Sequence, residues 1–356
     1  MSLMDRLQAR IHASGPMRLS DYMTDCLLHP DFGYYTTRDP LGAAGDFITA
    51  PEISQMFGEL IGLCLAQVWM DQGRPDRFTL AELGPGRGTL MADLLRATRA
   101  VPGFHAAADL VLVEASPTLR QAQARALSDA APRWIGEVTE LPTDQPLYLV
   151  ANEFFDALPI RQFLRDGDGW RERLVGLQDG ALIFGLGPQA DQPALAGRLP
   201  DTSEGDLVEH CEAAAPITAE IAARIAARGG AALIVDYGDW VSLGDTLQAL
   251  KGHQTADPLA TPGEADLTAH VDFEVLATAA RAAGAAHSRL TPQGVFLERL
   301  GITPRAQALA RGLTGPALDQ LVAAHRRLTH PEEMGNLFKV LGLFPADCNA
   351  PPGLER

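Results

Sequence analysis

The sequence predicts an α/β fold in which a mostly parallel sheet carries helices on both faces. Three observations predict it. Strand-like and helix-like segments alternate along the chain, a glycine-rich turn joins one strand to the next helix, and an acidic residue follows the second strand. The chain has 356 residues, of which 46% are hydrophobic, so one large domain with insertions, or two domains, is expected.

The elements follow from changes in hydrophobic period along the chain. Core strands are expected at residues 78–83, 110–115, 133–138, 147–151, 231–237 and 336–343. Helices are expected at about 89–100, 117–128, 216–228 and 303–329. The domains are expected to be an N-terminal helical cap or lid at 1–75, the first half of the core at 76–160, an inserted hairpin and loop subdomain at 161–215, and the second half of the core at 216–356, with an irregular insertion at about 239–270.

The segment 78–89 reads as a strand, a glycine turn and the first turn of a helix. Glycine has no Cβ and tolerates positive φ, so this backbone can approach a nucleotide-like ligand closely. The third glycine comes one residue earlier than in a dinucleotide fingerprint, and an acid stands two residues before the first. This form resembles motif I of the class I S-adenosylmethionine (SAM) methyltransferases. The residues expected to bind the donor here are Glu82, Gly84, Pro85, Gly86, Gly88 and Thr89.

A second apolar run, residues 109–113, is typical of a strand buried on both faces and leads into Glu114. In doubly wound sheets an acid at the tip of the second strand accepts hydrogen bonds from ribose hydroxyl groups. A carboxylate there disfavours NADP, although Glu114 alone does not separate NAD from other ribosides. We expect Glu114 and the nearby Ser116 to contact the donor.

Two acids and an amide follow the fourth strand, beside the first: Asn152, Glu153 and Asp156. Such strand ends present side chains to a ligand at the point where strand order reverses. A carboxylate can grip two guanidinium nitrogens and leave the third aimed at a methyl group. Glu153 and Asp156 are therefore the candidate catalytic residues and Asn152 a donor contact. In the alternative interpretation, Asn152 caps a helix and Asp156 favours its first turn.

Matching blocks over nearly the whole chain resemble the MidA-like SAM-dependent methyltransferases, which include a mitochondrial arginine methyltransferase needed for assembly of respiratory complex I. The blocks span residues 28–35, 45–59, 82–89, 152–159, 236–238, 263–273 and 334–341. The resemblance implies a seven-stranded sheet with an inserted second domain, SAM as methyl donor with S-adenosylhomocysteine (SAH) as product, and symmetric dimethylation of an arginine on a core complex I subunit. It places the donor site at Glu82, Gly84, Gly86 and Gly88, with the ribose contact at Glu114.

The remaining blocks supply candidates for a lid or a substrate site, and each has a structural alternative. These candidates are Asp46, Thr49, Glu52, Asp236, His270 and Asp272. The segment Gly45–Glu59 is either a lid over the donor or a rigid cap packed on the sheet. His270 and Asp272 share one side of an extended segment, where they bind substrate or serve the fold. Asp236 either lines the substrate pocket or caps a loop.

Composition excludes several other classes of function. The net charge of −16 argues against a nucleic-acid substrate, because phosphate binding needs clustered Lys and Arg. No segment has the apolar length of a membrane span. Four widely separated cysteines argue against a metal or disulfide framework. With no signal or transit sequence evident, a cytoplasmic location is expected. The oligomeric state stays open.

Two rival functions remain at this stage. An NAD-dependent oxidoreductase would share the strand–turn–helix, but the glycine spacing and the 152–156 block disfavour it. A non-catalytic SAM-binding assembly factor would share the fold, but the complete set of glycines and acids disfavours it. A radiolabelled methyl-transfer assay separates these alternatives.

Overall fold

The computed structural model describes residues 2–37 and 49–356, and the chain divides into two compact units. One unit comprises Met1–Phe47, Asp156–Ala214 and Val241–Val271. The other comprises Ile48–Phe155, Ala215–Trp240 and Asp272–Arg356, and we call it the core unit. The core unit contains the predicted strands and the glycine turn.

The core unit is built on a sheet whose main path has the order β15-β17-β10-β5-β2-β3-β4. The bounds are Ala285–His287 for β15, Phe338–Pro345 for β17, Gly230–Asp239 for β10, Leu147–Asn152 for β5, Phe78–Leu83 for β2, Ala108–Val113 for β3 and Arg133–Ile135 for β4. The five strands from β10 to β4 pair in parallel, whereas β17 pairs antiparallel with both of its neighbours. Two short strands, β14 (Val271–Asp272) and β16 (Thr291–Pro292), pair with β10 and β17 beside this path. Among the described residues, this sheet therefore has nine strands.

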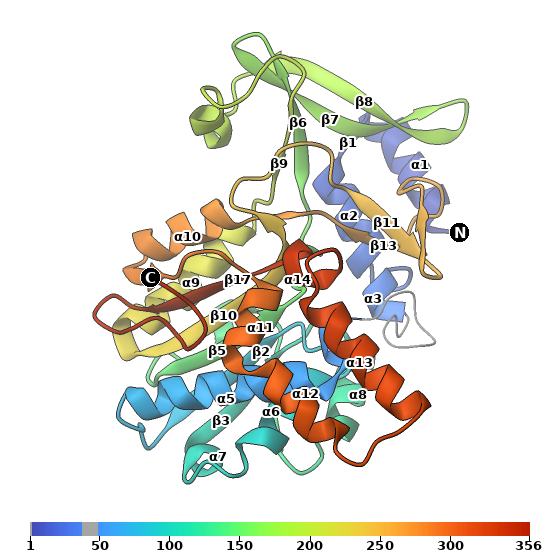
Figure 1. Cartoon of the computed structure of the whole chain (residues 1–356). Helices are drawn as coiled ribbons and strands as arrows, with labels where there is room; N and C mark the ends of the chain where they lie inside the picture. The colour runs from blue at the N-terminus through green and yellow to red at the C-terminus, as the bar shows by residue number, and fades with distance from the viewer. Residues whose placement is uncertain (1, 38–48) are drawn as a thin grey trace. The chain divides into compact units, whose positions relative to one another are not determined.

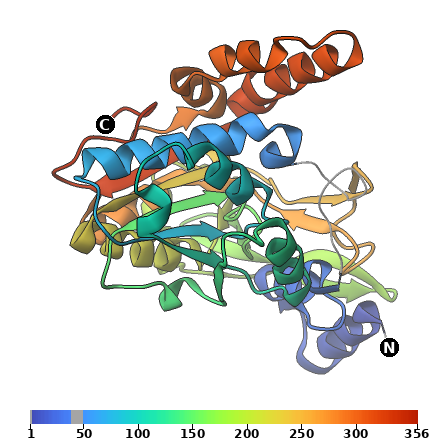
Figure 2. The same cartoon turned by 90° about the horizontal axis from the view of Figure 1, so that it is seen from below.

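Helices pack on both faces of this sheet, as Figures 1 and 2 show. On one face lie α5 (Gln55–Asp71) and α6 (Thr89–Thr98), with α12 (Ile302–Ala310) and α13 (Pro316–Thr329) beyond α5. On the other face lies α9 (Ala214–Arg228). The other helices of this unit are α4 (Ala50–Ile53), α7 (Phe104–Ala107), α8 (Pro117–Ala126), α10 (Phe273–Ala282), α11 (Gln293–Leu300) and α14 (Met334–Leu337).

Two glycines bring α5 against the helix that follows the glycine turn. A Cβ at Gly58 would lie 2.8 Å from the Leu90 carbonyl oxygen, and one at Gly62 would lie 2.7 Å from Cγ of Leu94. Real Cβ atoms do not approach so closely, so only glycine permits this packing. Because α5 is packed on α6 in this way, it belongs to the core unit and not to a separate cap.

The other unit has its own hydrophobic core. Its helices are α1 (Leu3–Ser14), α2 (Leu19–Leu28) and α3 (Tyr34–Thr37). One sheet contains β1 (Met17–Arg18), β6 (Arg161–Asp166), β7 (Gly169–Gln178), β8 (Ala181–Ala190) and β9 (Leu207–His210). A second sheet contains β11 (Gln248–Lys251), β12 (Gln254–Ala256) and β13 (Asp266–Thr268). The hairpin predicted over 161–187 corresponds to β6, β7 and β8.

Several boundaries differ from those the sequence predicts. The expected cap at 1–75 is divided between the units, since α4 and α5 pack in the core unit. The insertion at 239–270, expected to be irregular, forms the sheet of β11, β12 and β13. The helices expected at about 303–329 are α12 and α13, which residues 311–315 separate, where Gly312 and Gly315 adopt positive φ. Strand β4 stops at Ile135, three residues earlier than predicted.

Candidate methyl-donor site

The order of strands in the core sheet reverses between β2 and β5. From β2 the chain builds outward through β3 to β4, and it then returns to place β5 on the other side of β2. Leu83 pairs with Ala151, so the two strands end side by side. Ligands of doubly wound sheets bind outside the strand carboxyl ends at such a reversal. The glycine turn after β2 and residues 152–153 at the end of β5 therefore lie at the expected site.

The three glycines after β2 all take the left-handed backbone conformation. Their φ values are 58° at Gly84, 55° at Gly86 and 86° at Gly88, the residue that precedes the first turn of α6. A side chain at φ near +60° is strained, so this turn requires glycine. A Cβ at Gly84 would also lie 3.1 Å from Cδ2 of Phe154, which follows β5. Pro85 is buried between the first two glycines.

Two buried polar atoms at these strand ends have no hydrogen-bond partner within the described part of the chain: Oε2 of Glu82 and Oδ1 of Asn152. The two residues are 3% and 8% exposed. Burial, with a smaller contribution from the negative charge of Glu114, raises the pKa of Glu82 to about 8. Leaving a buried acceptor unpaired costs about 1–3 kcal/mol. A ligand rich in N–H and O–H donors offsets that cost, and SAM carries an ammonium group and ribose hydroxyls, so these residues fit it.

Glu114 directly follows β3 and is held by its neighbours. Its Oε1 accepts a hydrogen bond from the Ser116 backbone N–H at 2.8 Å, and its Oε2 accepts one from Nε2 of Gln123 at 3.0 Å. Burial raises the pKa of the carboxyl group, although these hydrogen bonds act against it. A carboxylate has about four acceptor positions, and these hydrogen bonds do not use all of them, so the group can still accept from a ribose. The hydroxyl of Ser116 accepts from the Leu119 N–H at 3.3 Å and caps α8.

Glu153 follows β5 in a strained conformation, with φ at 51°. Its N–H donates to the Val235 carbonyl at 2.9 Å. Its Oε1 accepts hydrogen bonds from the Ala50 N–H at 3.3 Å and from Nδ2 of Asn152 at 3.1 Å. Non-glycine residues held at positive φ cost about 1–3 kcal/mol and concentrate at functional sites. The fold therefore holds this carboxylate in a defined position at the point where the strand order reverses.

The short helix α4 connects this acid to the start of α6. Thr49 occupies the N-cap position of α4 without a side-chain hydrogen bond to the helix. Oε1 of Glu52 accepts a hydrogen bond from the hydroxyl of Thr89, the first residue of α6, at 2.5 Å. Over its described part the segment is thus tied by hydrogen bonds to Glu153 and to Thr89. Asp46, the other candidate from this block, lies outside the described residues.

Two of the remaining candidates have structural partners within the core unit. Asp236 is fully buried, and its Oδ2 accepts hydrogen bonds from the N–H groups of Phe154 and Phe155 at 3.2 and 3.0 Å. It holds the turn after Glu153. Asp272 caps α10, because its Oδ1 accepts from the N–H groups of Glu274 and Val275.

Asp156 and His270 fall in the other compact unit, whereas Glu153 and Asp272 fall in the core unit. The carbonyl of Asp156 accepts from the Ala269 N–H at 3.0 Å, and the His270 N–H donates to the Thr246 hydroxyl at 2.8 Å. Strand β14 ends at Asp272, so the segment is extended there as predicted, and helix α10 begins just after it.

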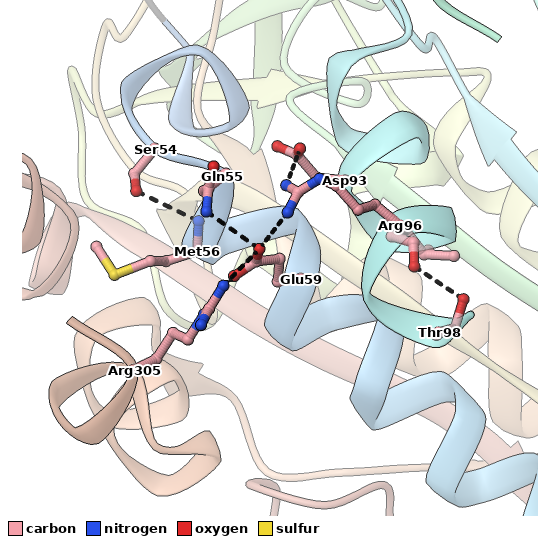
Figure 3. Close-up of polar contacts among 9 residues, drawn as sticks. Ser54, Gln55, Met56, Glu59, Asp93, Arg96, Thr98 and Arg305 are labelled. Atoms are coloured by element: carbon pink, nitrogen blue, oxygen red, sulfur yellow. Dashed lines mark hydrogen bonds and ion pairs between the residues drawn. The ribbon is translucent and has the colours of Figure 1, made fainter. Parts of the chain in front are cut away.

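An ion cluster centred on a buried acid joins α5, α6 and α12 (Figure 3), and the sequence did not predict it. Glu59 is 3% exposed and accepts from Nη1 of Arg96 at 2.6 Å and from Nε of Arg305 at 2.7 Å. Burial acts to raise the pKa of Glu59, but the hydrogen bonds from the two arginines outweigh it and the pKa is lowered. The only local signal is an acid within an apolar helical run, since Arg305 is 246 residues away. The cluster secures α6, whose first turn adjoins the glycine turn.

The described ranges contain neither a candidate metal site nor a candidate membrane-spanning helix. Nowhere in residues 2–37 and 49–356 do three or more His, Cys, Asp or Glu side chains gather so that they could hold a metal ion. Within the same residues, no helix has the length and apolarity needed to cross a membrane.

The chain is similar to known proteins over nearly its whole length. A family model for SAM-dependent methyltransferases matches residues 60–291. The mitochondrial protein arginine methyltransferase NDUFAF7 of Danio rerio is 38% identical over 373 residues, which cover 96% of this chain and 87% of that protein. Its Homo sapiens counterpart is 37% identical over 371 residues, which cover 96% and 83%. A crystal structure from Burkholderia thailandensis with bound SAH has a TM-score of 0.86 and 31% identity, and the match covers 99% of this chain and 94% of that one.

The cytoplasmic location expected from the sequence is contradicted by the two arginine methyltransferases, which are both named as mitochondrial proteins. That expectation rested on the lack of an evident signal or transit sequence.

Proposed function

Because the chain belongs to the family of SAM-dependent methyltransferases, we propose that it transfers the methyl group to an arginine side chain of a protein. Relatives across nearly the whole chain are named protein arginine methyltransferases, which supports this acceptor. The resemblance seen in the sequence further implies symmetric dimethylation and a subunit of respiratory complex I as the acceptor protein.

The observation that carries the proposal is the position of Glu153. It is a carboxylate held at positive φ at the end of β5, next to the strand that leads into the glycine turn. A guanidinium is cationic and a poor nucleophile. A carboxylate that binds two of its nitrogens holds the positive charge there and leaves the third nitrogen directed at the methyl group. Alignment of this kind can contribute roughly 7–11 kcal/mol to lowering the barrier.

The reaction balances without a further reagent. A bond forms between the guanidinium nitrogen and the methyl carbon as the bond from that carbon to the sulfonium sulfur breaks. The sulfonium becomes the neutral thioether of SAH, and the nitrogen releases one proton to solvent. In this proposal Glu82, Gly84–Gly88, Glu114 and Asn152 bind the donor, and Glu153 orients the acceptor. Asp156 is retained as a second candidate on the acceptor side.

Glu114→Ala is expected to weaken SAH binding by about 1.5–3 kcal/mol, the scale for losing a charged hydrogen-bond acceptor. The protein should remain folded, because Glu114 lies beyond the end of β3 and contributes little to the apolar core. Titration calorimetry with SAH measures the loss, and thermal unfolding without ligand checks the fold. An unchanged affinity would mean that other groups hold the ribose.

The assignment of a protein arginine as methyl acceptor can be tested in cells of the source organism from which the gene for this protein has been deleted. Mass spectrometry should show the loss of one dimethylarginine mark, and expression of the wild-type protein should restore it. Expression of Glu153→Gln should not restore the mark. A mark lost from lysine, glutamine or a small molecule would refute the arginine assignment. If SAH binds and no methyl mark changes, the protein would be a non-catalytic SAM-binding factor.

A further inference from the structure

Gln123, a fully buried residue of α8, joins the two parts of the proposed donor site. Its Nε2 donates to the Gly86 carbonyl at 2.8 Å and to Oε2 of Glu114 at 3.0 Å. Its Oε1 accepts from the indole Nε1 of Trp134, on β4, at 2.8 Å. One side chain thus contacts the glycine turn, the Glu114 carboxylate and the neighbouring strand β4.

The chemistry of these partners leaves the amide one orientation. An indole N–H only donates, so the amide oxygen must face Trp134. A carbonyl and a carboxylate only accept, so the two N–H groups must face Gly86 and Glu114. Turning the amide over would set donor against donor and acceptor against acceptor. The indole of Trp134 therefore fixes the direction in which Gln123 donates.

The backbone of α8 also lies against the glycine turn. A Cβ at Gly88 would lie 3.5 Å from Cα of Gln123, which is ordinary van der Waals contact. One turn earlier in α8, Nε of Arg120 donates to the Glu114 carbonyl at 2.8 Å. Helix α8 thus holds both the backbone and the carboxylate of Glu114.

We propose that Gln123 is a positioning residue for the methyl donor: it orients the Glu114 carboxylate toward the ribose and holds the Gly86 peptide in its bound conformation. This inference rests on the proposed placement of the donor at Gly84–Gly88 and Glu114. Gln123 uses one acceptor position of Oε2, and the Ser116 N–H uses one of Oε1. The remaining lone pairs of the Glu114 carboxylate then point in a fixed direction. The binding of SAM therefore does not have to order this carboxylate.

A purely structural role is the alternative, in which Gln123 only provides an acceptor for Trp134. Two substitutions separate these roles. Gln123→Glu keeps an oxygen for the indole but removes both N–H donors. Gln123→Met keeps the approximate volume and removes every polar atom. Gln121→Met changes an exposed residue of the same helix and serves as the matched control.

Calorimetry with SAH is the first measurement. Gln123→Glu and Gln123→Met should both bind SAH about tenfold or more weakly, as expected from the loss of a hydrogen bond to a charged group. Gln121→Met should bind as the wild type does. With saturating SAM, the turnover of both Gln123 variants should stay near the wild-type value while the KM for SAM rises. Normal SAH affinity in Gln123→Glu would overturn the proposal, since it would leave only the contact with Trp134.

The pH dependence of SAH binding provides a readout that a structural role would not change. Glu114 must be ionised to accept ribose hydroxyls, so affinity is full above its pKa and is lost as the pH falls through it. Burial already raises that pKa, while the N–H groups of Gln123 and Ser116 and the charge of Arg120 act to lower it. In Gln123→Met the loss of affinity should therefore begin at a higher pH than in the wild type. An unshifted profile would contradict the proposal.

Glu82 faces the same site from β2, and its own pKa is raised. Its titration must therefore be distinguished from that of Glu114. On a Glu114→Ala background, Gln123→Met should no longer shift the pH profile, because the group through which it acts is gone. A shift that persists there would assign the effect to Glu82 and overturn the role of Gln123. If Gly86→Val and Glu114→Ala bind SAH normally, the donor placement itself fails. If they lose binding while both Gln123 variants retain it, only this inference fails.

Discussion

Glu153→Gln is expected to bind SAM nearly as the wild type does and to transfer the methyl group at least about a hundredfold more slowly. The amide keeps an oxygen that can accept from the Ala50 N–H and from Asn152, so the local fold should survive. It removes the negative charge that holds the guanidinium. Loss of a preorganised charged interaction costs about 2.7–4 kcal/mol in the transition state, and each 1.36 kcal/mol is about tenfold in rate.

The measurement is single-turnover methyl transfer at saturating SAM, with SAH affinity determined in parallel. Asp156→Asn should have a smaller effect if Asp156 mainly serves the structure of its own unit. Glu332→Gln, an exposed acid of the core unit, should leave turnover unchanged. Near wild-type turnover in Glu153→Gln with SAM bound would move the acceptor-binding role to another residue, with Asp156, His270 and Asp46 next to be tested.

Gly86→Val is expected to abolish SAH binding. Gly86 has φ at 55°, and a β-branched residue is strongly disfavoured there, so the turn must change its path. A new path would also move the Gly86 carbonyl away from Nε2 of Gln123. The added side chain would occupy space that the donor needs against the backbone. Calorimetry and SAH-dependent thermal stabilisation should both show no response.

Gly180→Val is the matched control for backbone strain. Gly180 has φ at 80°, lies in the turn between β7 and β8, and has no heavy atom within 4 Å of an added Cβ among the described residues. It should cost stability to a similar extent while SAH binding persists. If Gly86→Val binds SAH normally, the donor does not lie on the glycine turn.

Local patterns predicted the core elements well. Strand β2 occupies the predicted residues, and the glycine turn leads directly into α6. Hydrophobic periodicity and turn-forming residues depend only on residues close together in the chain, so they can be recognised in the sequence. Strand ends are less well predicted. Strand β3 covers Ala108–Val113 instead of the predicted 110–115, because the β-propensity of the run does not specify where pairing with β2 and β4 begins and ends.

The roles of individual polar residues were predicted less completely. Asp236 and Asp272 had two open interpretations, and hydrogen bonds to the turn after Glu153 and to α10 now give each a structural account. The strain at Glu153 has no sequence signature, because any residue type can be forced to positive φ by its surroundings. Neither a periodic pattern nor a turn signal reveals it.

By itself the sequence determined the α/β class, the glycine turn, the acid after the second strand and the family resemblance. Each of these features depends on residues close together in the chain, or on whole sequence blocks that relatives share. Only the tertiary structure decided that α5 joins the core unit, that Glu59 meets Arg305, and that Gln123 bridges Gly86 and Glu114. Those contacts depend on strand order and helix packing, which bring together residues between 9 and 246 positions apart, and no local spacing encodes which distant partner a buried polar group will find.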